Sequence, residues 1–587
     1  MADVQIARVD AIPILFHWLK TMHIQEHIDT HWTSHREWEG LSYGQLAVIF
    51  LIFLIHERDH RLSALEPWVA EYLPTLLAVT GWPIRVQDAT DDRLGRLLYV
   101  LGQDPDQATT MQQAVGRQLI RVYALPTEIA RMDTTSFNVY HAPDAEASGA
   151  PHAALLRFGY SKDQRPDLLQ FKQALTTLDP GGVPLLSTTV PGNSADDPLY
   201  IPAWLDLVAL LGHATFVFVA DSKASALETR VTIAHGKGRY LFPQPMTGEV
   251  PVWLRERVTK QPTHELETIE LPPTLSDPDT PRVVGKGFVV PRTMRGFTAD
   301  GADVVWEERW LVVQSTAYGE RQQAAFDTRV LKVAAQLERL KPKADERAVD
   351  VEARIAKVLD EKGMRDYFTV SVRETPITRR KKAGRGRPSA DTPVIETTTY
   401  AVHGTITRND AAIAADRAML GWRVYVTNTT ADEVSLTRAM GIYREEWTVE
   451  RPMHCWKQGA LPVLPLFLQY DERIRGIMVL FLIALQVLTL LEWQARRTLA
   501  DEDSTLAGTY PGNPKRATAR PTATRMLDMF TSIHLYLQRV GDEWVGTILE
   551  ALTPVQQRIL HILKLPSTIY AFHATIPSGA GHGQKPR

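Results

Sequence analysis

The chain has 587 residues, of which 44% are hydrophobic and 23% charged, and its formal net charge is −3. This length is too great for one hydrophobic core and predicts about two to four domains. The composition is that of an ordinary soluble globular protein and excludes a fibrous or wholly disordered chain. The charge excludes an overall basic surface, so any contact with nucleic acid must come from local clusters of lysine and arginine. A metabolic enzyme would also have such a charge.

The single cysteine, Cys455, excludes an intrachain disulfide and cysteine-rich zinc modules, and it favours a reducing compartment. The first eight residues lack the basic start and apolar run of a signal peptide. The longest apolar run, Ile477 to Leu491, is interrupted by Gln486 and is too short to span a bilayer comfortably. We therefore expect this run to be a buried core helix of a cytoplasmic protein.

Residues 1–125 are predicted to form a helical N-terminal region. The segment from Leu41 to about Leu62 contains enough alanine, isoleucine, leucine and phenylalanine to fill most of a helix. A second helix is indicated after Asp91-Asp-Arg-Leu-Gly-Arg96, where leucines recur at helical spacing. A helical module in front of a catalytic domain suggests a DNA-binding region, and the alternative is a purely structural cap.

From residue 126 the pattern changes to short strands. The first three strands are expected at 129–138, 171–178 and 183–190, with a hairpin turn at Asp179-Pro-Gly-Gly182. A helix at about 199–211 and a fourth strand at 215–220 follow. Three antiparallel strands, a helix and another strand are the order of a ribonuclease H-like fold, whereas a generic α/β fold places a helix between every pair of strands. Residues 126–239 are therefore interpreted as the first part of such a core.

A long interval separates this part from the rest of the core, and one connection does not need so many residues. Residues 240–420 contain a charged helical pair from Ala324 to Asp360 and strand-like runs at 282–290, 304–314, 367–372 and 394–406. We interpret them as an independent, β-rich insertion outside the core sheet.

The core is expected to resume at 421–500, with a final strand at Gly421–Asn428, a helix around Glu450 and the apolar helix. Residues 501–587 are interpreted as a linker rich in proline, threonine, alanine and glycine, followed by C-terminal helices. The expected fold class is α/β: a ribonuclease H-like catalytic core with a mixed five-stranded sheet, interrupted by a β-rich insertion, with helical N- and C-terminal regions.

Three acidic residues far apart in the chain carry the chemistry. Asp133 and Asp221 each stand at the C-terminal end of an expected strand, and Glu450 stands on an expected helix. Hard cations take oxygen ligands, and two Mg²⁺ ions about 4 Å apart activate the nucleophile and stabilise the leaving oxygen in phosphoryl transfer. Each residue alone is more often a solvated surface charge. The combination indicates an enzyme that cuts and joins DNA.

The helix Tyr443-Arg-Glu-Glu-Trp-Thr-Val-Glu-Arg-Pro-Met-His-Cys-Trp-Lys457 resembles the Tyr-Arg-Glu-Lys signature of DDE insertion-sequence transposases. Tyr443, Glu450 and Lys457 fall on three of its four positions, and Glu446 stands where the family has arginine. Steps of seven residues are close to two helical turns, so we expect these three side chains to share one face of one helix.

The resemblance extends loosely from about residue 40 to 565, through Asp92–Arg96, Gly159–Leu168, Pro191–Ser194 and Asp471–Gly476. It implies the branch with a large β-rich insertion. It also implies that Asp133, Asp221 and Glu450 are the catalytic metal ligands for two Mg²⁺ ions, with Mn²⁺ as a possible substitute.

DNA contacts are expected in two places. The resemblance assigns them to the signature helix, at Tyr443, Lys457, the aromatic Trp447 and Arg444, which stands near the missing arginine. The second place is the run Arg379-Arg-Lys-Lys-Ala-Gly-Arg-Gly-Arg-Pro388, whose end resembles an AT-hook. The alternative there is a flexible basic loop without base preference. Its six cations are Arg379, Arg380, Lys381, Lys382, Arg385 and Arg387.

The leading hypothesis is a transposase that binds the terminal inverted repeats of its element, cuts DNA with Mg²⁺ and joins the ends to target DNA. It would act as a homodimer or larger assembly in a bacterial or archaeal cytoplasm, at the nucleoid and without a membrane. The alternative is a catalytically impaired descendant that acts as a repressor or host factor. A third hypothesis is a non-transposing nuclease of the same fold. The three carboxylates favour activity, and Glu446 is the evidence against it.

Overall fold

A nine-stranded mixed sheet forms the centre of the protein. The computed structural model describes residues 4–140, 155–272, 281–340, 342–343, 346–383, 393–445, 447–540, 543–548, 550–571 and 573–577. Neighbouring strands lie in the order β4-β3-β2-β5-β6-β12-β9-β8-β7. The bounds are β2 Ile129–Val139, β3 Leu169–Leu178, β4 Val183–Pro191, β5 Val217–Val219, β6 Arg239–Pro243, β7 Glu267–Leu271, β8 Arg282–Phe297, β9 Asp303–Ser315 and β12 Trp422–Thr427.

Strand directions divide the sheet into two parts. In the first part, β4, β3 and β2 are antiparallel, while β2, β5 and β6 run parallel to one another. In the second part, β12, β9, β8 and β7 are antiparallel throughout, and β12 also pairs antiparallel with β6. The protein is therefore a mixed α/β structure in which all nine strands are hydrogen-bonded into one sheet.

The first four expected strands are confirmed, but the expected five-stranded sheet is wrong. The fifth strand along the sheet is β6, which was not expected from the sequence. The strand that was expected in this fifth place is β12, which lies next to β6 on the far side from β5. The strands β7, β8 and β9 were expected to lie outside the core sheet. They extend it instead, because β9 pairs along the whole of β12. The residue boundaries proposed for the domains remain predictions.

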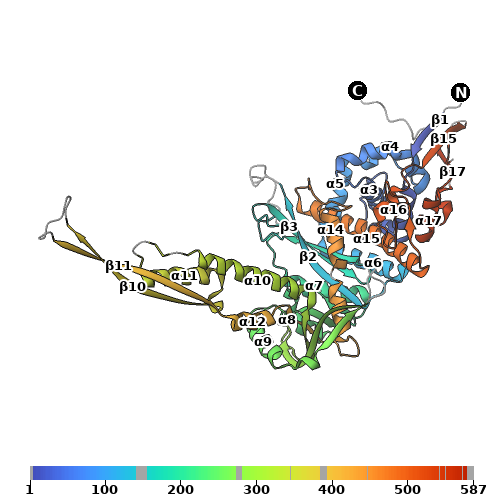
Figure 1. Ribbon diagram of the computed structural model, residues 1–587. Coiled ribbons are helices and arrows are strands. Elements are labelled where there is room, and N and C mark those ends of the chain that lie inside the picture. The colour runs from blue at the N-terminus through green and yellow to red at the C-terminus, as the bar shows by residue number, and fades with distance from the viewer. Residues whose placement is uncertain are drawn as a thin grey trace.

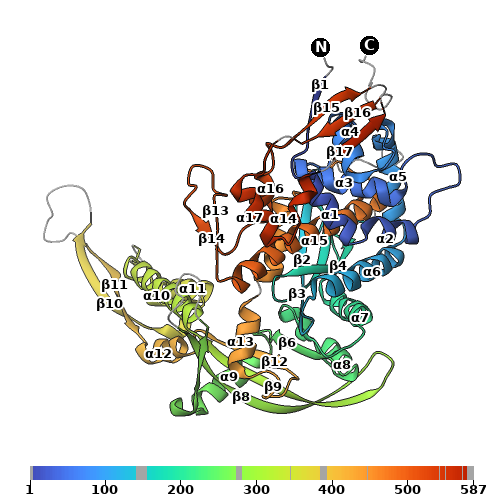
Figure 2. The same cartoon turned by 90° about the vertical axis from the view of Figure 1, so that its right-hand side faces the viewer.

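Helices of the N-terminal region gather around one long C-terminal helix, α15 (Asp471–Asp501), as Figure 2 shows. The expected helix after Leu41 is α3, and it begins as the sequence predicts: the Ser42 hydroxyl accepts from the Gln45 amide, and the Gln45 side chain accepts from the Ser42 amide. The N-terminal helices are α1 (Ile12–Thr21), α2 (Ile24–His31), α3 (Tyr43–Glu57), α4 (Leu62–Thr80), α5 (Asp91–Gly102) and α6 (Pro105–Tyr123).

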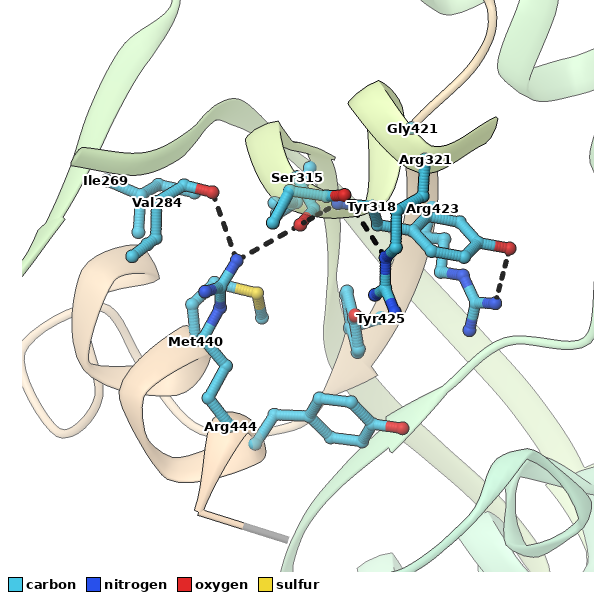
Figure 3. Close-up of a pocket in the computed structure, with 13 residues that line it drawn as sticks. Ile269, Val284, Ser315, Tyr318, Arg321, Gly421, Arg423, Tyr425, Met440 and Arg444 are labelled. Atoms are coloured by element: carbon cyan, nitrogen blue, oxygen red, sulfur yellow. Dashed lines mark hydrogen bonds between the residues drawn. The ribbon is translucent and has the colours of Figure 1, made fainter. Parts of the chain in front are cut away.

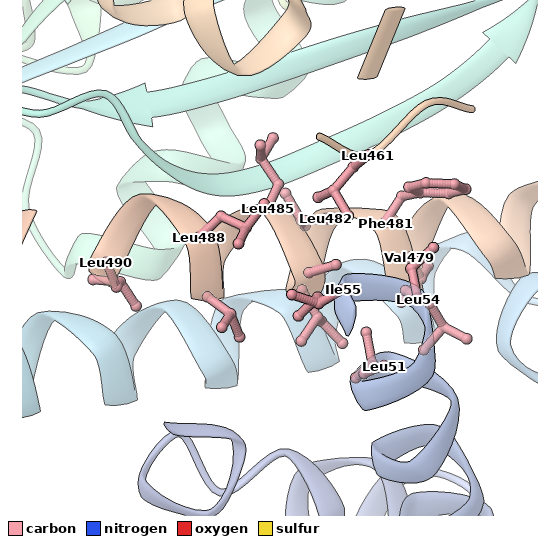
Figure 4. Packing of buried hydrophobic residues seen from close by; sticks show 14 of the residues in the cluster. Leu51, Leu54, Ile55, Leu461, Val479, Phe481, Leu482, Leu485, Leu488 and Leu490 are labelled. Atoms are coloured by element: carbon pink, nitrogen blue, oxygen red, sulfur yellow. The ribbon is translucent and has the colours of Figure 1, made fainter. Parts of the chain in front are cut away.

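The helix α15 is the centre of the main hydrophobic core (Figure 4). Its leucines, isoleucines and Phe481 are almost fully buried between the sheet and α3. Within the described ranges it is the one helix long and apolar enough to cross a membrane, and 89% of its apolar window is buried inside the protein. The expectation of a buried core helix at Ile477–Leu491 is confirmed. Gly476 allows α5 to approach closely, since a Cβ there would lie 1.9 Å from the Leu98 carbonyl oxygen.

Alternation along the strands gives the sheet two different faces. Ala130 and Met132 of β2 belong to the main core on one face, whereas Ile129 belongs to a second hydrophobic cluster on the other. That second cluster contains buried residues of α13 (Leu436–Arg444). The face covered by α13 is also the face toward which Arg131 and Asp133 alternate.

The helix expected to carry the whole Tyr443–Lys457 signature is broken in two. The first helix, α13, ends at Arg444, and α14 covers Trp447–Lys457. The Ile442 carbonyl would accept from the amide four residues later in a continuous helix. It accepts instead from the Glu445 amide and from the Arg131 guanidinium. Tyr443 therefore does not lie on the same helix as Glu450 and Lys457, as was expected, whereas Glu450 and Lys457 both lie on α14, two turns apart.

A buried ion pair holds this helix junction against the sheet. Arg131 Nε donates to Asp179 Oδ2 at 2.6 Å, and the two side chains are only 2% and 1% exposed. The other oxygen, Asp179 Oδ1, accepts from the Thr448 hydroxyl of α14 at 2.9 Å. Gly182 approaches so closely that a Cβ on it would lie 2.0 Å from the Thr448 carbonyl oxygen. The turn between β3 and β4 and both helices are thus tied to the middle of β2.

A long arm projects from the body of the protein (Figure 1). It is built from α10 (Thr316–Glu338), α11 (Ala348–Lys362) and the hairpin of β10 (Phe368–Lys382) with β11 (Val394–Arg408). Apolar residues of both helices and of the base of the hairpin form a separate small core. The hairpin pairs from Phe368↔Arg408 to Lys382↔Val394, and its outer half is exposed. The return to the sheet is made by α12 (Asp410–Ala418).

The C-terminal region contains strands as well as the expected helices. A four-stranded sheet has the order β1-β15-β16-β17, so β1, near the start of the chain, pairs with β15 of the C-terminal region. The expectation of a linker and C-terminal helices is therefore incomplete, because strands also belong to this region. Its elements are β13 (Leu506–Ala507), β14 (Ala517–Thr518), α16 (Ala523–Asp528), β15 (His534–Val540), β16 (Glu543–Thr547), α17 (Pro554–Ile562) and β17 (His573–Pro577), joined by β1 (Val4–Arg8). The remaining helices, near the sheet, are α7 (Tyr200–Leu211), α8 (Leu227–His235) and α9 (Val250–Lys260).

We predict that Arg131→Met destabilises the fold strongly. The change leaves Asp179 buried without its cation and the Ile442 carbonyl without its donor, which costs about 3–5 kcal/mol for a buried pair. Urea unfolding followed by tryptophan fluorescence would measure it. The matched control is Arg165→Met, which breaks an exposed pair with Asp167 and should leave the midpoint nearly unchanged. Equal midpoints for the two variants would show that the buried pair is unimportant.

Candidate functional site

Asp133 and Asp221 come from neighbouring parallel strands and meet at one pocket. Strand β2 pairs with β5 in a register that places Arg131 beside Val219, and each aspartate lies two residues further along its own chain. Asp133 was expected at the end of a strand, but it lies within β2, near the point where the shorter neighbouring strand β5 ends. Both aspartates line a narrow pocket of about 10 Å³, room for about one water-sized group.

The surroundings of Asp133 disfavour its charged form. Burial raises the pKa of Asp133 above its usual range, and the nearby Asp221 charge raises it further. Two groups act in the opposite direction: Lys162 Nζ lies 3.6 Å from Asp133 Oδ1, and the Thr134 amide donates to the same oxygen at 2.7 Å. Burial and Asp221 together outweigh these two groups, so the pKa of Asp133 stays raised.

Asp221 has its own set of donors. The Tyr200 hydroxyl and the Lys223 amide both donate to Asp221 Oδ1. Burial, followed by the nearby charge of Asp221, raises the pKa of Tyr200 far above its usual value, so its hydroxyl stays protonated and continues to donate. Lys223 Nζ pairs with the buried Asp196 at 2.8 Å, which fixes the turn after β5. Asp221 is thus held in one orientation before any ligand binds.

Glu450 is not gathered with the two aspartates. It is an exposed residue of α14 with no hydrogen bond or ion pair to any residue that the structure describes. Its neighbour Val449 lines the pocket, and Glu450 does not. In the described part of the chain, no group of three or more His, Cys, Asp and Glu side chains is arranged to hold a metal ion. The structure brings together two of the three expected carboxylates.

The two aspartates fit a hard cation by their donor chemistry. Mg²⁺ and Mn²⁺ take carboxylate oxygens, and a cation would favour the charged form of Asp133, whose pKa is raised by burial and to a lesser extent by Asp221. Lys162 supplies part of that positive charge in the present structure, and it also donates to the Thr134 hydroxyl at 2.8 Å. The site is therefore suited to exchange an ammonium group for a metal ion.

Tyr443 and Arg444 lie at the end of α13 but face different surroundings. Tyr443 lines the aspartate pocket, and its ring packs edge-on against Tyr425 with centroids 4.7 Å apart. Arg444 donates to the Val284 carbonyl at 3.0 Å and to the Ser315 hydroxyl at 3.1 Å, in a second pocket. Burial lowers its pKa from the usual value. Glu446, at the position of the family's arginine, lies outside the described residues.

The two other signature residues lie on α14. Lys457 Nζ forms a close ion pair with Asp163, at 2.7 and 2.8 Å from its two oxygens. Asp163 also accepts from the side-chain amide of Asn138 at 3.0 Å. The ion pair between Lys457 and Asp163 therefore links α14 to the loop that contains Lys162. Trp447 is 41% exposed, with the Arg520 guanidinium 5.9 Å from its ring centre.

The basic run lies at the far end of the arm. The last four residues of the strand β10 are exposed cations: Arg379, Arg380, Lys381 and Lys382. Arg380 pairs with Glu396 at 2.6 Å. Arg385 and Arg387 lie outside the described residues. This end of the arm lies away from the aspartate pocket, because the arm extends away from the sheet (Figure 1).

Sequence reasoning missed four residues of the site. Tyr200, Asp196 and Lys223 surround Asp221, and Lys162 faces Asp133. A signal was present for Lys162, because it stands in the Gly159–Leu168 segment already noted for its resemblance. The other three have no motif of their own, and they reach the site only through the packing of the chain after β4.

The chain was compared with known proteins at three levels. No protein-family model matches it, and no curated protein matches it. Among solved structures, it is similar to the piggyBac transposase in a cryo-EM structure of its synaptic complex with hairpin DNA. The two are 11% identical over 51% of this chain and 62% of that chain, with a TM-score of 0.23. The match thus spans less than two thirds of that chain, and at this score it establishes no common fold.

We predict that Lys162→Gln tightens binding of Mn²⁺ at the aspartate pair by about tenfold, because it removes a positive charge that competes with the metal. Calorimetric titration of the purified protein with Mn²⁺ would measure the affinity. Asp221→Asn serves as the negative control and should abolish this binding. Weaker binding by Lys162→Gln would mean that the lysine helps to build the site instead of competing for it.

Proposed function

We propose that this protein is a DNA transposase that binds the terminal inverted repeats of its element and catalyses Mg²⁺-dependent strand cleavage and strand transfer. Asp133, Asp221 and Glu450 are its proposed catalytic ligands. Its partners are the element ends and target DNA, bound by a homodimer or larger assembly at the bacterial or archaeal nucleoid. The observation that carries the proposal is the pair of aspartates that lie on adjacent parallel strands and line one pocket.

The arrangement of β2 to β6 supports this proposal. Three antiparallel strands come first, then a helix, then two strands parallel to the first, in the spatial order β4-β3-β2-β5-β6. This order supports the proposal of a ribonuclease H-like core, in which the first aspartate would lie on the central strand and the second after the adjacent one. The fold alone would not define a function, but carboxylates at these two positions supply the chemistry.

Each residue of the proposed site would have a separate role. A bound Mg²⁺ would activate the attacking water or 3′-hydroxyl and stabilise charge on the leaving oxygen. Asp133 and Asp221 would hold the ion, while Tyr200 keeps Asp221 oriented by its hydrogen bond. Glu450, on the helix whose Val449 lines the pocket, is the proposed third oxygen ligand. Lys457 would contact phosphate as a point charge once it leaves Asp163.

The arm supports a DNA partner. Each strand of the hairpin has 15 residues, which corresponds to roughly 50 Å of extended chain. Its small core lies at the base, so the outer half has no packing that would explain its length. Four exposed cations stand at that end, where they would reach backbone phosphates away from the aspartate pocket.

A second candidate function, a DNA-binding descendant without catalysis, is favoured by one observation. Glu450 is exposed and lies outside the pocket that contains both aspartates. If DNA does not draw Glu450 toward the aspartates, the protein would bind element ends without cutting them. The cleavage experiment below separates the two functions.

We predict that a supercoiled plasmid carrying the DNA from either side of the gene is cut by the protein with Mg²⁺. Asp133→Ala, Asp221→Ala and Glu450→Ala should each lower the cleavage rate by about 100-fold or more, because charge stabilisation in the transition state is lost. Affinity for the same DNA should change little. Gel analysis of cleavage and a filter-binding measurement would record both quantities.

Glu228→Ala is the matched control, since Glu228 is an exposed carboxylate of α8, shortly after Asp221. Cleavage at the wild-type rate by Asp221→Ala would refute the proposed catalytic role. Specific binding without cleavage by the wild-type protein would establish the second candidate function instead.

We predict that replacing Arg379, Arg380, Lys381 and Lys382 by glutamine weakens DNA binding and flattens its salt dependence. The slope of log affinity against log salt should fall by about 0.9 for each lost phosphate contact. Fluorescence anisotropy over a range of salt concentrations would measure it. The control removes four exposed cations from the stem of the arm: Lys332, Arg339, Lys357 and Lys362. Equal slopes for the two variants would mean that the end of the hairpin does not touch DNA.

A further inference from the structure

A second pocket lies on the same face of the sheet as the aspartate pocket. It has a volume of about 330 Å³, at the lower end of the range for small-molecule sites. Its floor is apolar and almost fully buried, formed by Ile269, Val284, Val313 and Met440. It is enclosed by the strands β7, β8, β9 and β12, by the start of α10 and by α13.

The walls of this pocket carry three arginines. Arg321 comes from α10, Arg423 from β12 and Arg444 from α13, and Figure 3 shows Arg444 on the opposite side of the pocket from the other two. None of the three lies within ion-pair distance of a carboxylate that the structure describes, and the lining residues include no aspartate or glutamate. Three cations gathered without an acidic partner favour an anionic ligand, and the arginine fork suits phosphate in particular.

The arginines are fixed by contacts that leave part of each guanidinium for a ligand. Arg444 bonds the Val284 carbonyl and the Ser315 hydroxyl through Nη2 alone. Arg423 donates to the Tyr318 hydroxyl at 2.8 Å, and its guanidinium lies 4.4 Å from the centre of that ring. Arg321 bonds only the Ala317 carbonyl, through Nε at 3.3 Å. The cations are therefore positioned in advance, which lowers the cost of binding.

Three tyrosines accompany the arginines. Tyr318, Tyr425 and Tyr443 line the pocket, and Tyr425 lies between Arg444 and Arg423 in Figure 3. Aromatic rings beside cations are the combination on which unpaired bases stack while their phosphates are held. Tyr443 lines both this pocket and the aspartate pocket, so a single side chain separates them.

We propose that this pocket binds one nucleotide, with the phosphate held by Arg321, Arg423 and Arg444 and the base against the tyrosine rings. The nucleotide is either a unit of a DNA strand or a free nucleotide, since both present the same chemistry. The proposal goes beyond the proposed function, because binding here needs neither a metal ion nor strand cleavage.

The test measures binding in the presence of EDTA, so that no cleavage intervenes. The probes are a fluorescent single-stranded oligodeoxynucleotide, a deoxynucleoside monophosphate and inorganic phosphate. Arg321→Gln and Arg423→Gln should each weaken binding by about tenfold or more, measured with the oligonucleotide or the monophosphate, whichever the wild-type protein binds. Arg329→Gln is the matched control, because it removes an exposed arginine of the same helix α10 outside the pocket. Wild-type protein should bind a nucleotide at least about tenfold tighter than phosphate.

The two sources of the ligand give different patterns. Arginine-dependent binding of the oligonucleotide alone assigns the pocket to a DNA strand, and arginine-dependent binding of the monophosphate assigns it to a free nucleotide. The proposal would be overturned if Arg321→Gln and Arg423→Gln bound both probes as tightly as the control Arg329→Gln. It would also be overturned if the wild-type protein bound phosphate as tightly as a nucleotide. Arg321 is exposed, so its variant decides the matter if Arg423→Gln fails to fold. Nucleotide binding by a protein that cuts no DNA would keep this proposal and refute the proposed function.

Discussion

The buried ion pair between Arg131 and Asp179 is the constraint on which the candidate site depends. Arg131 is the residue two positions before Asp133 on β2, and its guanidinium also donates to the Ile442 carbonyl of α13. Asp179 lies in the turn after β3 and holds Thr448 of α14. Because both side chains are buried, neither can exchange its partner for water at low cost. This one contact therefore sets where α13 ends, where α14 begins and how both approach the aspartates.

The same face of the sheet holds both pockets. Side chains alternate along β2 and β12, so Asp133 and Tyr425 point away from the main core and toward α13. Tyr443, at the end of α13, forms part of the wall of each pocket. An acidic pocket suited to a cation thus lies beside a basic pocket suited to an anion.

Much of the fold could be predicted because its signals are local. The strands of the first part of the sheet alternate or are continuously apolar, and Ser42 with Gln45 marks a helix start in four residues. The pairing of distant segments had no such signal. The short β6 was missed, and β12 was placed in its position, because both read as apolar strands and only hydrogen bonding distinguishes their neighbours. The break between α13 and α14 was missed because its cause, Arg131, is more than 300 residues away in the chain.

The sequence by itself determined local features of the chain: two aspartates in strand contexts, a run of cations and an apolar helix that had to be buried. These follow from residue types and spacings that act over a few residues. Only the tertiary structure decided that Asp133 and Asp221 share a pocket, that Glu450 stands outside it, and that three arginines from separate segments meet beside it. Those facts depend on the register of strands and on buried contacts between remote segments. Their energies arise only when the chain has folded.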